Sequence, residues 1–539
     1  MQELSPKTVV VETPRSTIAG PWSGWIGIAV LAVLIYFIRD RHQFSNPQFW
    51  AEDATVFLAV SVRDALLDFV HPYAGYFHFG PRTLALIGSF FPVVLAPKIF
   101  FYAAVVVAAA SCVVIYRMVR TLPAYLRVLF ALAPLLVLPA GEVYGNVTNV
   151  QWFCGAVFGV LVLTYRADTF RSRGWLALGA ALALTGPFSV VFWPCLFAWS
   201  LLTRRLRLNA AMLTVVGVGA LIQLATIAIM GTNKYGVGFA GEAAWLRAVK
   251  IFLATFVTLH GVKAGIAFLA VIALLAYGLY RNLGKLRLGY LPAGLLCMTA
   301  LTLLMGLWTH KHMPDLLNPL GPGERYYFLP FNFLLMAVIA SAPAAGKKYG
   351  WLCFLVVVLL IFGWTRHFGK DEQTDFRWRD YYALSQRAPD ALIPILPSWV
   401  FRPPQEAQDS AVQPVPVDLS GLKATFGELH VDGGGHALSR ANGPEGADPQ
   451  IFFDVPSACL NDPHRFVRVA LKDAARVRLF LANADGSFAG PGSQSWPIGA
   501  GDHWYYDVPR ELDKQKVRLD VASDSGTVVH GLDVSWVCW

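Results

Sequence analysis

Two adjacent carboxylates, Glu52 and Asp53, are the residues of this chain best suited by type and position to carry out chemistry. They lie in a polar segment that follows the first long apolar run. A carboxylate in apolar surroundings can act as a general base or face a metal ion. Alternatively, both side chains complement the N-terminal dipole of a helix. Asn46 and Pro47 predict the start of that helix, as N-cap and first helical residue.

A dense group of imidazole and aromatic side chains follows in the same predicted loop. It comprises His71, Tyr73, Tyr76 and His78, and it ends at Arg82. Tyrosines alone are typical of the aromatic belt at a membrane surface. Two histidines and an arginine close to a carboxylate pair favour instead a site that binds a polar molecule.

Arg325 is the strongest candidate for binding an anion. It opens an apolar run within the motif Gly323-Glu324-Arg325-Tyr326-Tyr327-Phe328. The guanidinium fork matches the geometry of phosphate oxygens. The alternative is an interfacial anchor with flanking tyrosines.

The run His310-Lys311-His312 with Asp315 also concentrates polar groups at the end of an apolar run. Its spacing matches no strong metal signature. We therefore expect phosphate or sugar contacts here. A metal cluster is the alternative, which the sequence does not support, and we expect no cofactor.

Amide side chains gather at the start of another apolar run. Asn146, Asn149, Gln151 and the neighbouring Trp152 can bind sugar hydroxyls. The same side chains can equally cap and pair helix ends, and the sequence leaves both roles open.

The elements that must position these residues are apolar. The mean hydropathy is +0.49 and charged residues are 15% of 539, whereas soluble chains carry about 25%. The sequence predicts a mainly α-helical polytopic membrane protein with about eleven spans and additional juxtamembrane helices, one of them amphipathic over Ala54 to Phe69. The predicted spans are 22–38, 98–117, 124–140, 149–165, 174–187, 188–203, 210–230, 264–281, 288–309, 326–343 and 349–366.

Loop charge orients these spans. The basic connections fall on one side, which the positive-inside rule assigns to the cytoplasm together with the N-terminus. They are Arg117 to Arg127, Arg166 to Arg173, Arg204 to Arg207, Arg281 to Arg287, and Lys347-Lys348. The net charge of +9 is thereby explained without a nucleic-acid partner. Two stretches, Gly80 to Pro97 and Ala243 to Val262, can each be read as a span, a re-entrant segment or a surface helix.

Composition divides the chain into four parts. We expect a cytoplasmic tail over 1–20, a transmembrane domain over 21–370, a linker over 371–416 and a periplasmic β-sandwich of jelly-roll type over 417–539. Five cysteines fall within apolar runs, whereas Cys459 and Cys538 lie in the last part. These two can form a disulfide in an oxidising compartment. Trp496, Trp504, Tyr505 and Tyr506 can form a sugar-stacking surface or pack in the core.

The motifs resemble those of the GT-C class of membrane glycosyltransferases. The resemblance rests on Trp50-Ala51-Glu52-Asp53 and covers roughly residues 20–370. Four other segments support it: Tyr73-Ala74-Gly75-Tyr76 with Pro81-Arg82, Asn146 to Trp152, Thr185-Gly186-Pro187-Phe188-Ser189, and Gly323 to Phe328.

The resemblance implies an inverting transfer of a sugar from a polyprenyl-phosphate donor to a hydroxyl of a glycan, lipid or protein. The reaction would take place on the periplasmic face of a bacterial inner membrane. An outer-loop carboxylate would be the base, and we favour Asp53 with Glu52 as its partner. Cationic groups would bind the leaving phosphate, and the candidates are Arg325, Arg82, Lys234, His310, Lys311 and His312. Contacts to sugar or acceptor would come from His71, Tyr73, Tyr76, His78, Asn146, Asn149, Gln151, Trp152, Glu324, Tyr326 and Tyr327.

Two other classes compete with this interpretation. A transporter or flippase of a lipid-linked saccharide predicts ionisable residues inside spans and inverted repeats, and the sequence has few of the former and no evident repeat. The other class is an acyl or phosphoethanolamine transferase, or a non-catalytic assembly protein for cell-surface glycan. An outer Ser or Thr nucleophile or a clear zinc-ligand set would favour the transferase, and neither appears in the sequence.

Overall fold

The chain forms two compact units in the computed structural model. The helical unit comprises Met1–Pro47, Asp64–Phe91 and Ala96–Gln373, and the β unit comprises Gln48–Arg63, Pro92–Leu95 and Thr374–Trp539. The structure describes residues 23–64, 70–138, 141–167, 172–231, 242–258, 261–282, 290–310, 317–321, 323–342, 347–403, 412–433, 435–440, 449–482, 487–488, 494–499, 501–510, 516–523 and 528–539.

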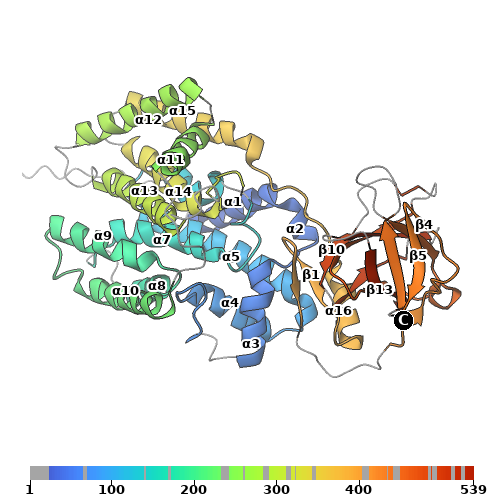
Figure 1. The fold of residues 1–539 in the computed structure, drawn as a ribbon. Coiled ribbons are helices and arrows are strands. Elements are labelled where there is room, and N and C mark those ends of the chain that lie inside the picture. The colour runs from blue at the N-terminus through green and yellow to red at the C-terminus, as the bar shows by residue number, and fades with distance from the viewer. Residues whose placement is uncertain are drawn as a thin grey trace, which may run out of the picture. The chain divides into compact units, whose positions relative to one another are not determined.

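Helices build the whole of the described helical unit (Figure 1). Their bounds are α1 Ser23–Arg39, α2 Arg41–Ser45, α4 Phe79–Ser89, α5 Ala96–Met118, α6 Ala124–Leu136, α7 Val150–Thr164, α8 Arg173–Ala183, α9 Phe188–Leu202, α10 Ala210–Met230, α11 Glu242–Val257, α12 Gly261–Asn282, α13 Tyr290–Thr309, α14 Arg325–Ser341, α15 Lys347–Trp364 and η6 Thr365–His367.

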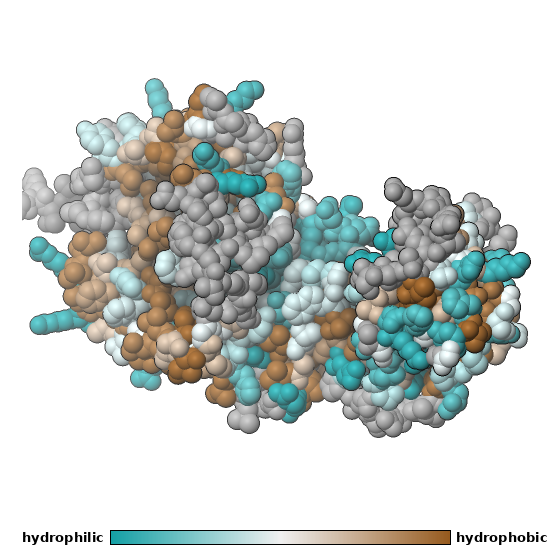
Figure 2. All heavy atoms as spheres, viewed as in Figure 1, coloured by the Kyte–Doolittle hydropathy of each residue, from teal (hydrophilic) through white to brown (hydrophobic). Residues whose placement is uncertain are grey.

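Each of the eleven predicted apolar runs coincides with a helix, namely α1, α5 to α10 and α12 to α15. Within the described residues, three helical segments are long and apolar enough to cross a membrane: Val93–Met118, Ala210–Met230 and Leu291–Thr309. Within the same described residues, shorter apolar segments of 10–17 residues lie in α1, α6, α7, α9, α12, α14 and α15. Large apolar side chains such as Ile229 and Phe362 face outward, and hydrophobic residues cover much of the visible face of this unit (Figure 2). Such a surface is typical of contact with lipid or with another protein.

The centre of the helical unit is α14. Every residue from Tyr327 to Ser341 is buried. This part of the helix therefore has no outward face, which explains why it is apolar on all sides. It packs within one hydrophobic cluster together with α5, α6 and α7.

The two stretches that can be read as a span, a re-entrant segment or a surface helix, Gly80 to Pro97 and Ala243 to Val262, contain the short helices α4 and α11. α4 has 11 residues and therefore a length of roughly 17 Å, against a hydrocarbon thickness of about 30 Å. α11 has 16 residues and is not among the segments suited to cross a membrane.

The prediction that Asn46 caps a helix starting at Pro47 is wrong. Asn46 instead ends α2, and its backbone N–H donates to the His42 carbonyl. The next helix begins at Ala51. The intervening residues are held extended, because the Leu396 N–H donates to the Phe49 carbonyl at 3.0 Å and Trp50 pairs with Leu396. Tertiary pairing thus overrides the local capping signal.

The β unit consists mainly of antiparallel strands (Figure 1). Its strands are β1 Ile393–Ile395, β2 Trp399–Phe401, β3 Val415–Pro416, β4 Ala424–Thr425, β5 Gly427–Asp432, β6 Gly435–Arg440, β7 Gln450–Asp454, β8 Arg465–Ala470, β9 Ala475–Leu481, β10 Gln494–Ile498, β11 His503–Asp507, β12 Lys516–Ser523 and β13 Val528–Cys538. Its helical segments are η1 Asp53–Leu58, α3 Ala59–Asp64, η3 Val93–Leu95, α16 Trp378–Arg387 and η7 Ser457–Cys459.

Two sheets share one hydrophobic core. One has the strand order β10-β9-β12-β7-β4, and the other has the order β11-β8-β13-β6-β5, with β3 also paired to β13. Val477 and Leu519 of the first sheet lie in the same buried cluster as Val469 and Trp536 of the second. The β-rich character expected of 417–539 is confirmed. The assignment to a jelly roll stays a prediction.

The segment expected as a linker, 371–416, contains regular structure. It holds α16 and the hairpin of β1 and β2. Trp378 at the start of α16 donates to the Val94 carbonyl and contacts Phe49. These contacts place the segment within the β unit.

Candidate functional site

A buried turn anchors the loop that carries Tyr76 and His78. α8 and α9 meet at Thr185 to Pro187, and His78 pairs with Thr185 across an antiparallel bridge. The Thr185 hydroxyl accepts the Gly80 N–H at 3.0 Å. Gly186 has φ +80°, a left-handed conformation that glycine adopts without strain.

The side chain of Gln223 in α10 forms hydrogen bonds both to this loop and to the turn between α8 and α9. Its Oε1 accepts the Phe77 N–H at 2.9 Å, and its Nε2 donates to the Phe77 and Gly186 carbonyls at 3.2 and 3.0 Å. The side chain is fully buried. A buried amide with its groups satisfied by main chain fixes the backbone on both sides, so Gln223 sets the position of the loop.

We define the Arg325 cluster as Tyr76, Gln151, Trp152, His310, Arg325 and Tyr326. The Tyr326 ring is the centre of this cluster, since it lies 5.6 Å from the Trp152 ring, 4.2 Å from the His310 ring and 5.4 Å from the Arg325 guanidinium carbon. Tyr76 interacts with Tyr326, Arg325 and Gln151. Four segments therefore contribute to one group of side chains: the loop before α4, the start of α7, the residue after α13 and the start of α14.

The protonation states in the cluster follow from burial. Burial lowers the pKa of His310, and the nearby Arg325 lowers it further, against a hydrogen bond to the Gly306 carbonyl. Burial raises the pKa of the Tyr76 phenol, and Tyr326 adds to this. At neutral pH both side chains are therefore uncharged, and Arg325 supplies the positive charge of the cluster.

A carboxylate pair lies next to Arg325. The Glu142 carboxylate is 3.0 Å from Arg325 Nη1, with both side chains about one-third exposed. The Glu142 N–H donates to the buried Glu324 carboxyl. Burial raises the pKa of Glu324 to about 7, the Glu142 charge adds to this rise, and Lys370 and Arg39 oppose it.

Further charged side chains are buried near Glu324, among them Arg39 and Lys370. Arg39 donates from Nη1 to the Leu135 and Val137 carbonyls at 2.8 and 3.0 Å, which satisfies the C-terminal end of α6. Lys370 lies 3.7 Å from the Asp40 carboxylate, and both are buried. Six charged residues, three of each sign, are thus connected: Arg39, Asp40, Glu142, Glu324, Arg325 and Lys370. Nearby groups of opposite sign lower the cost of burying Arg39, Asp40, Glu324 and Lys370.

Several predicted contact residues hold the local fold. Asn146 and Asn149 each donate to the Glu142 carbonyl at 2.7 Å, and Asn149 Oδ1 accepts the Trp152 indole N–H. Of the two roles left open for these amides, the observed contacts are those of helix-end pairing. The buried Arg82 donates to the His71 carbonyl at 3.2 Å.

The other predicted residues are placed as follows. His78 is buried and stacks on Tyr76 at 4.4 Å, with the Tyr73 ring 5.6 Å away. Tyr327 is buried and donates its hydroxyl to the Leu317 carbonyl. Lys234, Lys311 and His312 lie outside the described residues, as does Asp315.

The acidic pair belongs to the β unit. Asp53 is buried and begins η1, a π-helical turn within the helix that runs from Ala51 to Asp64. Glu52 immediately before it is partly exposed. π-helical turns within α-helices are rare and occur frequently at functional sites.

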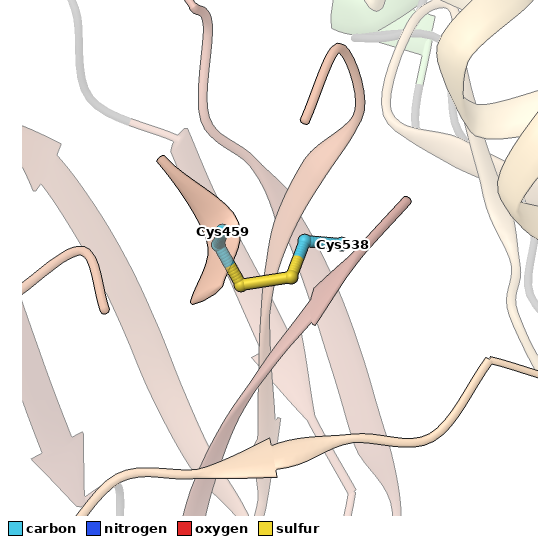
Figure 3. Close-up of a disulfide and its surroundings, with 2 residues drawn as sticks. All are labelled: Cys459 and Cys538. Atoms are coloured by element: carbon cyan, nitrogen blue, oxygen red, sulfur yellow. A yellow bond between two sulfur atoms is a disulfide. The ribbon is translucent and has the colours of Figure 1, made fainter. Parts of the chain in front are cut away.

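Cys459 and Cys538, singled out in the sequence, are joined by a disulfide (Figure 3). Their Cα atoms are 5.5 Å apart. With Asp462 they form the one group of metal-ligand types found among the described residues. Both sulfurs are used in the disulfide, so this group does not offer a metal site.

Sequence reasoning missed the charged residues behind Arg325. Arg39 and Asp40 end the first apolar run, Glu142 precedes the Asn146 motif, and Lys370 follows the last run. Charges at the ends of apolar runs were a usable signal for buried pairing. Their partners are hundreds of residues away, however, and only the fold identifies them.

Comparisons with family models, with curated proteins and with solved structures find no match for this chain.

Proposed function

We propose that this protein is a membrane glycosyltransferase of GT-C type, which transfers a sugar from a polyprenyl-phosphate donor to an acceptor hydroxyl. One observation carries the proposal: Tyr76, from the loop before α4, and Trp152, from the start of α7, lie next to Arg325 and Tyr326 at the start of α14. A cationic fork among aromatic rings suits a ligand that joins a phosphate to a sugar.

In the proposed reaction, the acceptor oxygen attacks the anomeric carbon of the donor sugar. The bond from that carbon to the phosphate oxygen breaks, and polyprenyl phosphate leaves with the electron pair. The acceptor proton passes to a carboxylate, for which we propose Asp53, with Glu52 as its partner. Arg325 would stabilise the charge that develops on the leaving phosphate.

The setting we propose is a bacterial inner membrane crossed by eleven spans, with the β unit as a jelly-roll-like sandwich in the periplasm. The outward-facing apolar side chains of the helices support the membrane location. The disulfide supports the compartment, because disulfides persist where the environment is oxidising.

The test is a transfer assay with the full chain in lipid nanodiscs. Polyprenyl-phosphate hexoses and pentoses with a radiolabelled sugar serve as donors, and cell-envelope glycan serves as acceptor. Arg325→Gln should lower the transfer rate about 100-fold, as loss of one stabilising donor does elsewhere. Arg207→Gln, an exposed arginine in the turn before α10, is the matched control and should retain the wild-type rate.

The base is tested in the same assay. Asp53→Asn should lower the rate by about 10² or more, whereas Glu52→Gln should have a smaller effect. Wild-type rates for both variants would make the base assignment wrong. Movement of a lipid-linked saccharide across the membrane of vesicles, with no radiolabelled sugar transferred to the acceptor, would support a flippase and overturn the proposal.

A further inference from the structure

The β unit contains a pocket of about 240 Å³ that lies entirely within that unit. Its walls come from the chain before and within α16, from the β1–β2 hairpin and from the strands β10 and β11. Phe376, Arg377, Tyr381, Gln494, Trp496 and Asp507 are the lining residues that matter here. Sites for drug-sized ligands have volumes of roughly 300–1,000 Å³, so this pocket suits a smaller group.

The charges in the pocket wall are paired. Arg377 Nη1 lies 2.6 Å from the Asp507 carboxylate, and its Nη2 lies 2.8 Å from Asp380. Asp507 is buried, and Gln494 donates to its carbonyl at 2.9 Å. The carboxylates here outnumber the single guanidinium. An anionic ligand such as a phosphate is therefore disfavoured, whereas hydroxyl groups find both donors and acceptors.

Aromatic rings supply the apolar part of the wall. The Phe376 and Trp496 rings lie 5.8 Å apart, and Trp496 is stacked on Trp504 at 4.8 Å. Tyr381 is fixed by its hydroxyl, which donates to the Tyr505 carbonyl at 2.8 Å. Rigid aromatic side chains beside a few oriented polar groups are the usual composition of a small-molecule site.

The pocket is held open by the segment that precedes the acidic pair. Gln48 Nε2 donates to the Asp375 carboxylate at 3.2 Å, and Gln48 Oε1 accepts the Phe376 N–H at 3.1 Å. The Leu396 N–H donates to the Phe49 carbonyl at 3.0 Å. Arg377 itself has φ +49°, a conformation that non-glycine residues adopt rarely and often at functional sites. Both walls are thus fixed before any ligand arrives.

We propose that this pocket binds a single neutral sugar ring, such as the terminal residue of a glycan. The apolar face of the ring would pack against Phe376 and Trp496, and its hydroxyls would bond to Gln494, Arg377 and Asp507. This binding does not rest on transfer activity. It gives the β unit a role in holding a glycan, whichever reaction the helical unit performs.

The test uses the full chain in detergent and saturation-transfer NMR with methyl glycosides of glucose, galactose, mannose, rhamnose and arabinose. Ser495→Trp and Ser398→Trp each fill the pocket from an exposed position on a different wall. Ser457→Trp places the same side chain at an exposed site of the β unit away from the pocket. Thermal unfolding of all three variants verifies that they fold.

We expect at least one glycoside to bind the wild type, with its signal lost in both pocket variants and kept in Ser457→Trp. Absence of binding by all five glycosides overturns the proposal. Binding that survives both pocket variants also overturns it, since the sugar then lies elsewhere. Competition by inorganic phosphate, tested in the same samples, would show that the ligand is an anion and contradict the proposal as well.

Discussion

Glu142 and Arg325 form an ion pair, with 3.0 Å between the carboxylate and Nη1. The pair joins the loop before α7 to the first residue of α14. Glu142 also donates its N–H to the carboxyl of Glu324. Glu142 therefore contacts both Glu324 and Arg325. The position of the arginine therefore depends on a loop that is far away in sequence.

Neutralising Glu142 should strengthen donor binding. In Glu142→Gln, Arg325 loses a competing anion, and we expect the KM for a polyprenyl-phosphate sugar to fall several-fold. The melting temperature should change little, because partly exposed ion pairs contribute roughly 0–1 kcal/mol. Glu372→Gln alters an exposed carboxylate and serves as control. An increased KM for Glu142→Gln would indicate that the carboxylate orients Arg325 rather than competing for it.

Gly141→Ala should displace the Glu324 carboxyl, because a Cβ at this position would collide with Glu324 Oε1. The pKa of Glu324, raised to about 7 by burial, should then fall toward its ordinary value. The folded wild type keeps a proton that the unfolded chain releases, so stability decreases as pH rises from about 4.5 to about 7. This decrease should be smaller in Gly141→Ala, as measured by thermal unfolding across that range.

The matched control for that experiment is Gly369→Ala, an exposed loop glycine with open space around its Cβ position. It should leave the pH dependence as in the wild type. An unchanged pH dependence in Gly141→Ala would exclude Glu324 as the group that titrates near neutral pH.

Gln223→Leu should loosen the loop that carries Tyr76 and His78. The substitution removes three hydrogen bonds to main chain, and each is worth about 1 kcal/mol. We expect a destabilisation of about 3 kcal/mol and faster protease cleavage between α3 and α4. Leu221→Ala, at an exposed position of the same helix, should have a much smaller effect. Equal cleavage of the two variants would contradict the role assigned to Gln223.

Asp507→Asn should reduce the pH dependence of the stability of the β unit. Burial raises the pKa of Asp507 to about 7, although Arg377 lowers it. The folded state thus binds a proton that the unfolded chain has released, and stability falls as pH rises from about 4 to about 7. The full effect is on the order of 4 kcal/mol. The difference in melting temperature between about pH 5 and about pH 7.5 should shrink in Asp507→Asn and persist in Asp533→Asn, which alters an exposed carboxylate.

Removing the disulfide should destabilise the β unit strongly. Cys459 and Cys538 are separated by 79 positions, and closing a loop of that size contributes about 4 kcal/mol by the chain-entropy estimate. The double variant Cys459→Ser with Cys538→Ser should therefore unfold at lower temperature and be cleaved faster by protease within 417–539. Cys297→Ser, which alters an exposed free cysteine, should behave as the wild type. A double variant as resistant as that control would show that the bond is dispensable.

The elements could largely be predicted from sequence, because apolar periodicity and length are local properties. All eleven apolar runs form helices, and the alternation around β8 and β12 marks real strands. The expectation of a linker over 371–416 did not anticipate the β1–β2 hairpin, since proline is tolerated in short edge strands such as these.

The site was less accessible to sequence reasoning, because its groups meet only through the fold. Tyr76, Trp152 and Arg325 were recognised singly. Nothing local in the sequence indicated that Tyr326 would lie next to Tyr76 and Trp152. The π-helical turn at Asp53 and the ion pair of Glu142 also depend on packing. Asn46 shows the reverse case, a correct local capping residue whose helix is prevented by pairing at Trp50 and Leu396.

The membership of Gln48–Arg63 in the β unit has a consequence for biosynthesis. The ribosome makes this segment roughly 300 residues before it makes the strands with which the segment packs. At about 5–20 residues per second, the nascent segment waits for tens of seconds, while the chain from α4 onward is being synthesised. Throughout that delay Asp53 and its neighbours lack the later part of the β unit, so this segment reaches its folded packing only after most of the chain has been made.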